Sequence, residues 1–329
     1  MFNENMHIRG DVFEAKEQGA TREGFGRGLV EAGERDPRVV ALCADLTDST
    51  RVEPFRQKFP ERFIEVGVAE QNLAALGSGF AAVGKIPFIT SYAAFNPGRN
   101  YEQIRTTICL NEMPVKIGGM HSGVSVGPDG ATHQALEDMA LMRVVPHMTV
   151  IYPCDIEEAR KATLAAAQFD GPVYLRFARE KTPVMTTTET PFEIGKANVL
   201  WRGESPQAVI FATGPLLHNA LIAARDLAGQ GIGTIVTNVH TIKPLDKDTI
   251  VGLAKEVGAV VTVEEHQAAG GLGSAIAELL VQEHPVPMEF VGVHNLFGQS
   301  GKPDELIKHY GLDAASISQA VMKVIGRRG

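Results

Sequence analysis

Cysteines, aromatic residues and basic blocks are all scarce in this 329-residue chain. The three cysteines, Cys43, Cys109 and Cys154, are odd in number and have no CxxC spacing, which argues against a disulfide framework or a zinc site. Each lies in or beside an apolar run, so we expect buried free thiols in a reducing cytoplasm. The formal net charge of -8 and the lack of a basic block exclude a nucleic-acid partner.

Long apolar runs are also missing. No segment has the length of a membrane span, and residues 1–19 lack the apolar stretch of a secretory signal. We therefore expect a cytoplasmic protein with no membrane partner, whose residues 1–20 form a polar arm that is frayed or clasps a dimer partner. Because the chain has no global positive field, an anionic substrate would need a few local arginines.

Alternating strand and helix patterns predict two three-layer α/β domains, the first with a mainly parallel sheet and the second smaller. We place the first domain at 21–180, a linker rich in Thr and Pro at 181–204, and the second domain at 205–329. Strands are expected at 39–43, 63–66, 87–91, 115–118, 149–152, 173–177, 208–212, 233–239, 259–264 and 288–293. Helices are expected at 21–33, 71–83, 99–110, 133–143, 156–168, 215–229, 246–257, 272–282, 303–309 and 314–324.

One acidic residue stands at the junction of a strand and a helix. In Phe63-Ile-Glu-Val-Gly-Val-Ala-Glu-Gln-Asn72, the strand ends near Gly67 and a helix of small residues begins after Glu70. A carboxylate in this position can be a solvated cap that the helix dipole stabilises. Alternatively, the apolar strand and the small residues let a flat ring approach the carboxyl group, and desolvation would raise its proton affinity.

Two further clusters follow at ordered distances. The segment 91–101 carries three aromatic residues among small ones, which suits either core packing or the stacking of a heterocycle. The glycine-rich loop 118–133 carries His121, Asp129 and His133, which suit the recognition of a polyol, and its Thr132 could cap the next helix. Since His-x11-His with one Asp is not a known ligand spacing, we expect no metal site in this chain.

Taken as a set, these segments resemble the pyrimidine-binding domain of transketolases. The runs Ala212-Thr-Gly-Pro215 and Val263-Glu-Glu-His266, with Gly-Gly-Leu-Gly-Ser274, resemble the C-terminal domain of the same family. The resemblance implies thiamine diphosphate as cofactor, with Glu70 as the acid that hydrogen-bonds its pyrimidine nitrogen. It also implies that the ring stacks on Phe95, and it places three more residues near the cofactor, which are Tyr92, Tyr101 and Asp45.

The resemblance assigns a second group of residues to the sugar substrate. Guanidinium groups suit a sugar phosphate, since their paired donors match its oxygens. His121 and His133 would contact the substrate during catalysis, and Asp129 would read a donor hydroxyl. The implied phosphate-binding residues are Arg22, Ser49 and Arg179.

The chain also departs from the family pattern. It has no Gly-Asp-Gly sequence, which in transketolases belongs to the half that binds the metal and the diphosphate. The resemblance is therefore to the C-terminal subunit of a split transketolase. It implies an N-terminal partner subunit that holds Mg²⁺ or Ca²⁺, and a second copy of this chain in a heterotetramer. Because Phe95-Asn-Pro-Gly-Arg99 is one residue longer than in related enzymes, Arg99 receives no role.

Several functions remain open at this point. The expected reaction transfers a two-carbon ketol unit from a phosphorylated ketose to an aldose acceptor, as in the pentose phosphate pathway. Two relatives use the same half of the cofactor site, namely deoxyxylulose-phosphate synthases and the beta subunits of 2-oxo acid dehydrogenases. His121 disfavours the first, where the family has aspartate, and the run Asp129 to His133 disfavours the second. A relative for an unusual sugar and a non-catalytic assembly or regulatory subunit are further alternatives.

Overall fold

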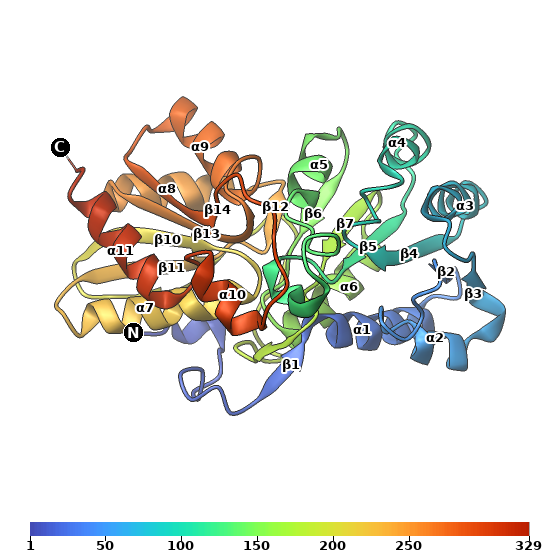
Figure 1. Ribbon diagram of the computed structural model, residues 1–329, viewed down its shortest axis with the longest axis horizontal. Helices are drawn as coiled ribbons and strands as arrows, with labels where there is room; N and C mark the ends of the chain where they lie inside the picture. The colour runs from blue at the N-terminus through green and yellow to red at the C-terminus, as the bar shows by residue number, and fades with distance from the viewer. Residues whose placement is uncertain (329) are drawn as a thin grey trace.

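Two β-sheets, each with helices on both faces, lie side by side in the protein (Figure 1). The computed structural model describes residues 1–328. The first sheet has seven strands in the order β12-β6-β7-β5-β4-β2-β3, and the second has five in the order β14-β13-β10-β11-β9. All neighbours in both sheets are parallel except β12 and β9, which pair antiparallel at one edge of each sheet. The predicted α/β class with two domains is confirmed.

The first domain follows the expected alternation closely. Strand β2 is continuously apolar and all five of its residues are buried, as a parallel strand covered on both faces requires. The elements are β1 (Gln18–Ala20), α1 (Thr21–Arg35), β2 (Val39–Cys43), α2 (Glu53–Lys58), β3 (Phe63–Glu65), α3 (Glu70–Ala82), β4 (Ile86–Tyr92), α4 (Tyr101–Gln103), β5 (Lys116–Met120), α5 (Asp138–Val144), β6 (Thr149–Ile151), α6 (Ile156–Gln168) and β7 (Val173–Arg176).

The second domain repeats this pattern on a smaller sheet. Helices α7 and α11 pack on one face of the sheet and α8 and α9 on the other (Figure 1). The elements are β8 (Lys181–Pro183), β9 (Asn198–Arg202), β10 (Pro206–Ala212), α7 (Leu217–Ala228), β11 (Gly233–Asn238), β12 (Thr241–Lys243), α8 (Lys247–Val257), β13 (Val260–Gln267), α9 (Leu272–Glu283), β14 (Met288–Val293), α10 (Pro303–His309) and α11 (Ala314–Ile325).

Glycines allow the two helices on one face of the first sheet to approach closely. A Cβ atom at Gly24 of α1 would lie 2.0 Å from the main-chain oxygen of Ile156 in α6. Helix α3 and the π-helical segment Ile104–Cys109 lie on the opposite face. That face shares one hydrophobic cluster with α8 and α9, so the apolar core runs through both domains without a break.

Strand β12 was not predicted, and it ties the domains together. It belongs to the second domain in sequence but pairs with β6 of the first sheet. The fully buried guanidinium group of Arg176 adds to this connection. It donates to Asp138 Oδ2 at 2.8 Å, to the main-chain oxygen of Ala135 at 3.1 Å, and to that of Glu265 in β13 at 3.0 Å. Polar and backbone pairing therefore both cross the domain boundary.

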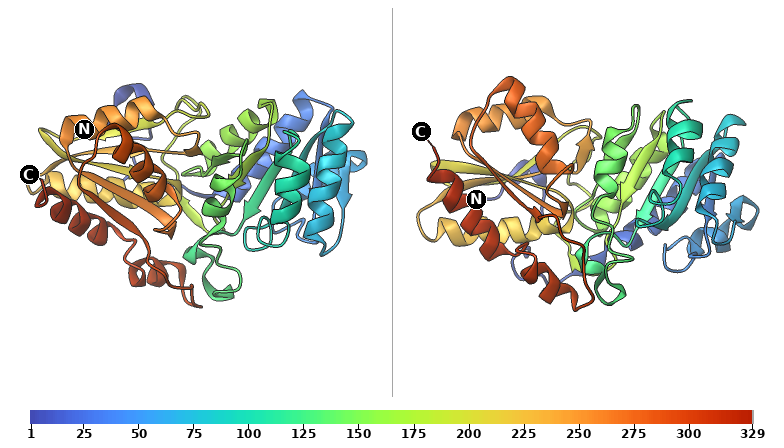
Figure 2. Two further views of the ribbon diagram at one scale, coloured as in Figure 1. Left: turned by 90° about the horizontal axis from the view of Figure 1, so that it is seen from above. Right: turned by 45° about the horizontal axis from the view of Figure 1, so that its top comes forward.

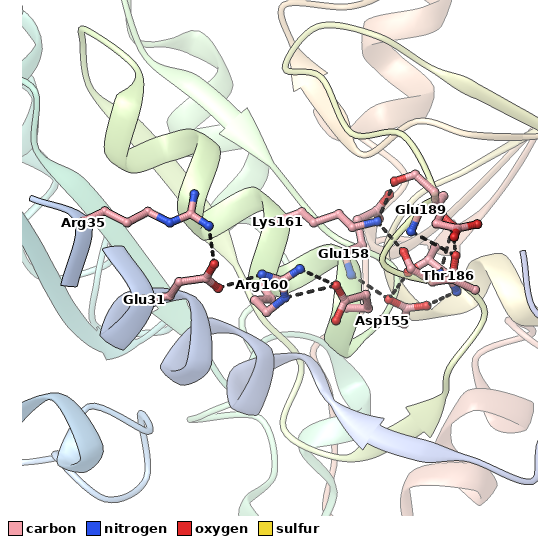
Figure 3. Close-up of polar contacts among 11 residues, drawn as sticks. Glu31, Arg35, Asp155, Glu158, Arg160, Lys161, Thr186 and Glu189 are labelled. Atoms are coloured by element: carbon pink, nitrogen blue, oxygen red, sulfur yellow. Dashed lines mark hydrogen bonds and ion pairs between the residues drawn. The ribbon is translucent and has the colours of Figure 1, made fainter. Parts of the chain in front are cut away.

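The segment predicted as a linker is firmly held instead. It contains β8, which pairs with β1, and β9, which completes the second sheet. Between these two strands, the main-chain nitrogens of Met185 and Thr186 donate to the side chain of Asp155, at the start of α6, at 2.7 and 2.6 Å (Figure 3). Lys161 of the same helix donates to the main-chain oxygen of Thr190 at 2.5 Å. Backbone pairing and two side chains of α6 therefore hold the segment that joins the domains.

The N-terminal residues pack against the chain's own second domain, where we expected a frayed arm or a clasp on another copy. Phe2 and Phe13 both lie edge-on to Trp201 of β9, with ring centroids 5.2 and 6.1 Å away. The main-chain nitrogen of Asn3 donates to Leu200 at 2.9 Å. Aromatic packing and edge-strand pairing together hold this segment.

Two predicted helices differ from the observed ones. The helix expected at 99–110 is a short α4 followed by the π-helical segment. The helix expected from His133 begins only at Asp138, so Thr132 does not cap it. The reason is tertiary, since Gln134 is buried and donates to the main-chain oxygens of Val124 at 3.0 Å and Gln299 at 2.9 Å. These bonds hold 131–137 as an irregular loop.

The remaining sequence expectations concern thiols and membranes. Cys43, Cys109 and Cys154 are all buried and free, as predicted. Burial raises the pKa of the Cys109 thiol to about 11, which keeps it protonated and unreactive. Within residues 1–328, no helix combines the length and the apolar character that crossing a bilayer requires.

Candidate active site

Residues with reactive or hydrogen-bonding side chains gather at the carboxyl ends of the parallel strands in the first domain. Glu70 begins α3 shortly after β3, Tyr92 ends β4, His121 follows β5, and Arg179 lies just beyond β7. Parallel strands all point the same way, so their carboxyl ends meet at one edge of the sheet. That edge is where open α/β sheets bind their ligands.

The carboxyl group of Glu70 is nearly enclosed at the N-terminus of α3, with 4% of the residue exposed. Ser91 Oγ donates to its Oε1 at 3.3 Å, and Arg99 Nη1 lies 3.2 Å from its Oε2. Asn100 Nδ2 donates to the main-chain oxygen of Glu70 at 3.0 Å and so joins α3 to the turn after β4. The N-terminus of the helix favours an acidic group here.

Four rings lie together beside this carboxyl group. Tyr92 stacks on His121 with ring centroids 4.1 Å apart and on Phe95 at 6.1 Å. His133 meets Phe95 edge-on at 5.4 Å and Tyr92 at 6.0 Å. Offset and edge-on arrangements at these distances are favourable for aromatic pairs. Two of the three predicted aromatics, Tyr92 and Phe95, therefore form one continuous wall with the two predicted histidines.

The imidazole of His121 is held neutral and in a defined tautomer. Burial, together with the guanidinium groups of Arg22 and Arg179, lowers the pKa of His121 to about 3. Arg22 Nη1 lies 2.9 Å from Nε2, and an arginine can only donate, so Nε2 accepts and Nδ1 carries the proton. Among residues 1–328, this buried Nδ1 has no hydrogen-bond partner. It is free to donate to a bound ligand.

Charged side chains of both signs line a cleft of about 910 Å³ between the two domains. The basic ones include Arg22, Arg51 and Arg179, and the acidic ones include Glu23 and Glu180. Burial and the charges of Arg51 and Arg179 lower the pKa of Arg22. Arg22 Nη1 also donates to the main-chain oxygen of Ser49 at 2.9 Å. Where Arg22 lies close to Arg51 and Arg179, the local positive charge suits an anionic ligand.

The loop that carries His121 and Asp129 is supported from the second domain. Glu265 Oε1 accepts from the main-chain nitrogen of Ser125 at 2.6 Å. Arg179 Nη1 donates to the main-chain oxygen of Val126 at 2.7 Å and lies 3.5 Å from Asp129 Oδ1. Helix α10 lies beside the same loop in both views of Figure 2. Both domains therefore set the position of this loop.

Two predicted site residues stand apart from this cluster. Tyr101 begins α4 and packs against the hydrophobic core of the first domain. Asp45 is exposed, with φ of 58°, and its main-chain nitrogen donates to Glu65 Oε1 at 2.7 Å. The positive φ shows that the β2–α2 loop turns sharply at this point. Neither side chain touches the rings or arginines described above.

The sequence did not reveal three residues of the site. Arg99 contacts Glu70, Arg51 lines the cleft, and Glu265 holds the glycine-rich loop. Glu265 lies in the run Val263-Glu-Glu-His266, which was a usable signal because two adjacent acids in a buried strand need partners. Arg51 and Arg99 lie in loops without a distinguishing pattern.

The residues of this site suit the pyrimidine half of thiamine diphosphate. Glu70 offers a buried carboxyl group, and Phe95 offers a ring face that contacts the same Arg99 guanidinium group as this carboxyl group does. No cluster of three or more His, Cys, Asp or Glu side chains in residues 1–328 could hold a metal ion.

Comparison with family models is decisive for the identity of both domains. Residues 17–185 match the transketolase pyrimidine-binding domain, and residues 195–317 match the transketolase C-terminal domain. The chain belongs to the transketolase family. It corresponds to the C-terminal section of a transketolase, and it spans about half the length of full-length relatives, with 37% identity to the human enzyme over 93% of this chain and 49% of that one.

Two relatives of similar length are named as parts of a transketolase. A putative transketolase C-terminal section from Methanocaldococcus jannaschii is 41% identical over 92% of this chain and 95% of its own length. A 6-deoxy-6-sulfo-D-fructose transketolase subunit from Clostridium sp. (strain MSTE9) is 41% identical over 91% of this chain and 92% of its own.

A solved structure agrees with this assignment. It is described as a split gene transketolase, an inactive beta4 tetramer, and it superposes with a TM-score of 0.88 at 43% identity. The match covers 94% of this chain and 99% of that one.

Proposed function

We propose that this chain is the C-terminal subunit of a thiamine diphosphate-dependent transketolase, which moves a two-carbon ketol unit from a phosphorylated ketose to an aldose. One observation carries the proposal. The buried carboxyl group of Glu70 and the ring wall around Phe95 lie at the same sheet edge as Arg22 and Arg179, which line the cleft between the domains. A heterocycle and an anionic sugar can therefore be bound next to each other.

The bound cofactor would supply the nucleophilic carbon that carries the two-carbon unit. Glu70 would hydrogen-bond the pyrimidine nitrogen and hold the proton there, while Phe95 would support the ring face. His121 Nδ1 would donate to a substrate oxygen as a neutral group, because its pKa of about 3 excludes a charged ring at pH 7. Arg22 and Arg179 would hold the terminal anion of the sugar.

The diphosphate and its Mg²⁺ or Ca²⁺ would be held by an N-terminal transketolase subunit. Support comes from the two relatives whose names describe a transketolase C-terminal section and a transketolase subunit. A second copy of this chain would complete a heterotetramer. The solved neighbour described as an inactive beta4 tetramer is consistent with activity that needs the other subunit.

The test is two-carbon transfer from xylulose 5-phosphate to ribose 5-phosphate, with thiamine diphosphate and Mg²⁺. The chain is assayed alone and with an N-terminal transketolase subunit, and activity is expected only in the mixture. Glu70→Gln should lower kcat by roughly 10²–10⁴-fold, as loss of a general acid does. The control is Glu61→Gln, since that residue is exposed. Activity of Glu70→Gln within about tenfold of wild type would contradict the role of Glu70.

One finding favours a second substrate. The sulfosugar transketolase subunit is as similar to this chain, at 41% identity, as the archaeal section is. Sulfonate and phosphate are both tetrahedral anions that a pair of arginines can hold. The same mixture should therefore be assayed with 6-deoxy-6-sulfo-D-fructose as donor, and the ratio of the two kcat/KM values would show which sugar the cleft prefers.

A further inference from the structure

Arg99 engages both groups that we assign to the pyrimidine ring. Its Nη1 lies 3.3 Å from Glu70 Oε1 and 3.2 Å from Oε2, and its Cζ lies 4.1 Å from the centroid of the Phe95 ring. A guanidinium group is planar and carries N–H donors, so it can stack on an aromatic ring while it binds a carboxylate. An aminopyrimidine is also planar and would use the same carboxyl group and the same ring.

Buried side chains hold the main chain around Arg99, whereas the Arg99 side chain itself is half exposed. Asn96 is fully buried and donates to the main-chain oxygens of Ile89 at 3.4 Å and Gly118 at 3.2 Å. Asn100 binds the backbone of Glu70, as described above. The side chain of Arg99 is 50% exposed, so it can rotate into solvent without disturbing the turn.

The two contacts need different states of Glu70. The ion pair with Arg99 needs an ionised carboxylate, which only accepts hydrogen bonds. Hydrogen bonding to an unprotonated ring nitrogen needs the protonated acid, which donates. We propose that Arg99 and the cofactor pyrimidine compete for Glu70 and Phe95, so that cofactor binding displaces the Arg99 side chain into solvent. This inference rests on the proposed transketolase function, because it takes thiamine diphosphate as the ligand.

The test measures cofactor affinity and not activity. Thiamine diphosphate is titrated by calorimetry, with Mg²⁺ present, into the complex of this chain with an N-terminal transketolase subunit. Arg99→Met keeps a long side chain but removes the charge and the donors. Loss of a half-exposed competing ion pair should tighten Kd by about two- to fivefold. Arg27→Met, at an exposed position of α1, is the matched control and should leave Kd unchanged.

The comparison with Glu70→Gln separates competition from a general structural effect. In that background Arg99 has no carboxylate to bind, so Arg99→Met should no longer tighten Kd. Arg99→Lys keeps the charge but not the planar stacking, and its Kd should lie between those of wild type and Arg99→Met. If Arg99→Met fails to assemble with the partner subunit, the Kd of Arg99→Lys serves as the test instead.

Two results would overturn the inference in different ways. The first applies where the wild-type complex binds the cofactor. Equal binding by Arg99→Met would then show that Arg99 does not affect cofactor binding, and weaker binding would show that Arg99 contacts the bound ring. Failure of the assembled wild-type complex to bind thiamine diphosphate rejects the proposed function, and the inference with it.

Discussion

Replacing Asp138 by asparagine should destabilise both domains together. The carboxylate is 1% exposed and accepts hydrogen bonds from Tyr174 Oη at 2.7 Å and Arg176 Nε at 2.8 Å. Without it, a fully buried guanidinium charge remains uncompensated. Breaking a buried ion pair typically costs about 3–5 kcal/mol. Because Arg176 keeps its bonds to the main-chain oxygens of Ala135 and Glu265, we expect about 3 kcal/mol, the lower end.

The assay is urea unfolding followed by two signals. Far-ultraviolet circular dichroism reports both domains, and the fluorescence of Trp201, the only tryptophan, reports the second domain. Since Arg176 bonds to Glu265 and β12 completes the first sheet, both transitions should move to lower urea by the same amount.

A surface ion pair supplies the matched control. Asp226 is half-exposed and lies 2.8 Å from Arg225, so Asp226→Asn should change the free energy of unfolding by less than about 1 kcal/mol. A cost below about 1 kcal/mol for Asp138→Asn would refute the charge argument. A shift of the dichroism signal with an unmoved Trp201 transition would refute the coupling of the domains.

Three further outcomes are expected. Arg179→Ala should raise KM for phosphorylated donors by about tenfold with a smaller change in kcat, and an unchanged KM would remove it from the anion site. His121→Asn should lower kcat/KM but keep the shape of its pH profile between pH 6 and 8, because the pKa of about 3 leaves the ring neutral there. Burial raises the pKa of Glu264 to about 7, so its contribution to stability is full below pH 4.5 and is lost through pH 7. In urea unfolding, the free energy of unfolding of the wild type should therefore fall by about 3 kcal/mol between pH 4.5 and pH 7 because of this group, and Glu264→Gln should remove that fall.

Local patterns predicted most of the fold. The strand at 39–43 and the helix at 156–168 match the observed bounds, because a continuous apolar run and a clear helical period need no tertiary information. Strands β1, β8, β9 and β12 were missed, since each pairs with a segment that is distant in sequence. The late start of α5 has the same cause, because buried bonds of Gln134 override the helical pattern before Asp138.

The site also divides into features that the local sequence predicts and features that depend on residues distant in sequence. Glu70 stood out because its position between a strand and a helix of small residues can be read from neighbouring letters alone. The neutral state of His121 could not be read in this way, since it arises from burial and from two arginines that are distant in sequence. The contact of Arg99 with Glu70 depends on the conformation of one loop, which spacing does not encode.

Strand β12, which comes from the second domain but pairs in the first sheet, has a consequence for the growing chain. During synthesis, β6 leaves the ribosome well before Thr241–Lys243. Until that later segment is made, the edge of β6 is unpaired and the apolar face beside it is uncovered. Unpaired edges of this kind invite pairing with other chains. A fragment that ends at residue 185, where the pyrimidine-binding domain ends by family comparison, would keep that edge permanently and should aggregate, so the two domains are best expressed as one piece.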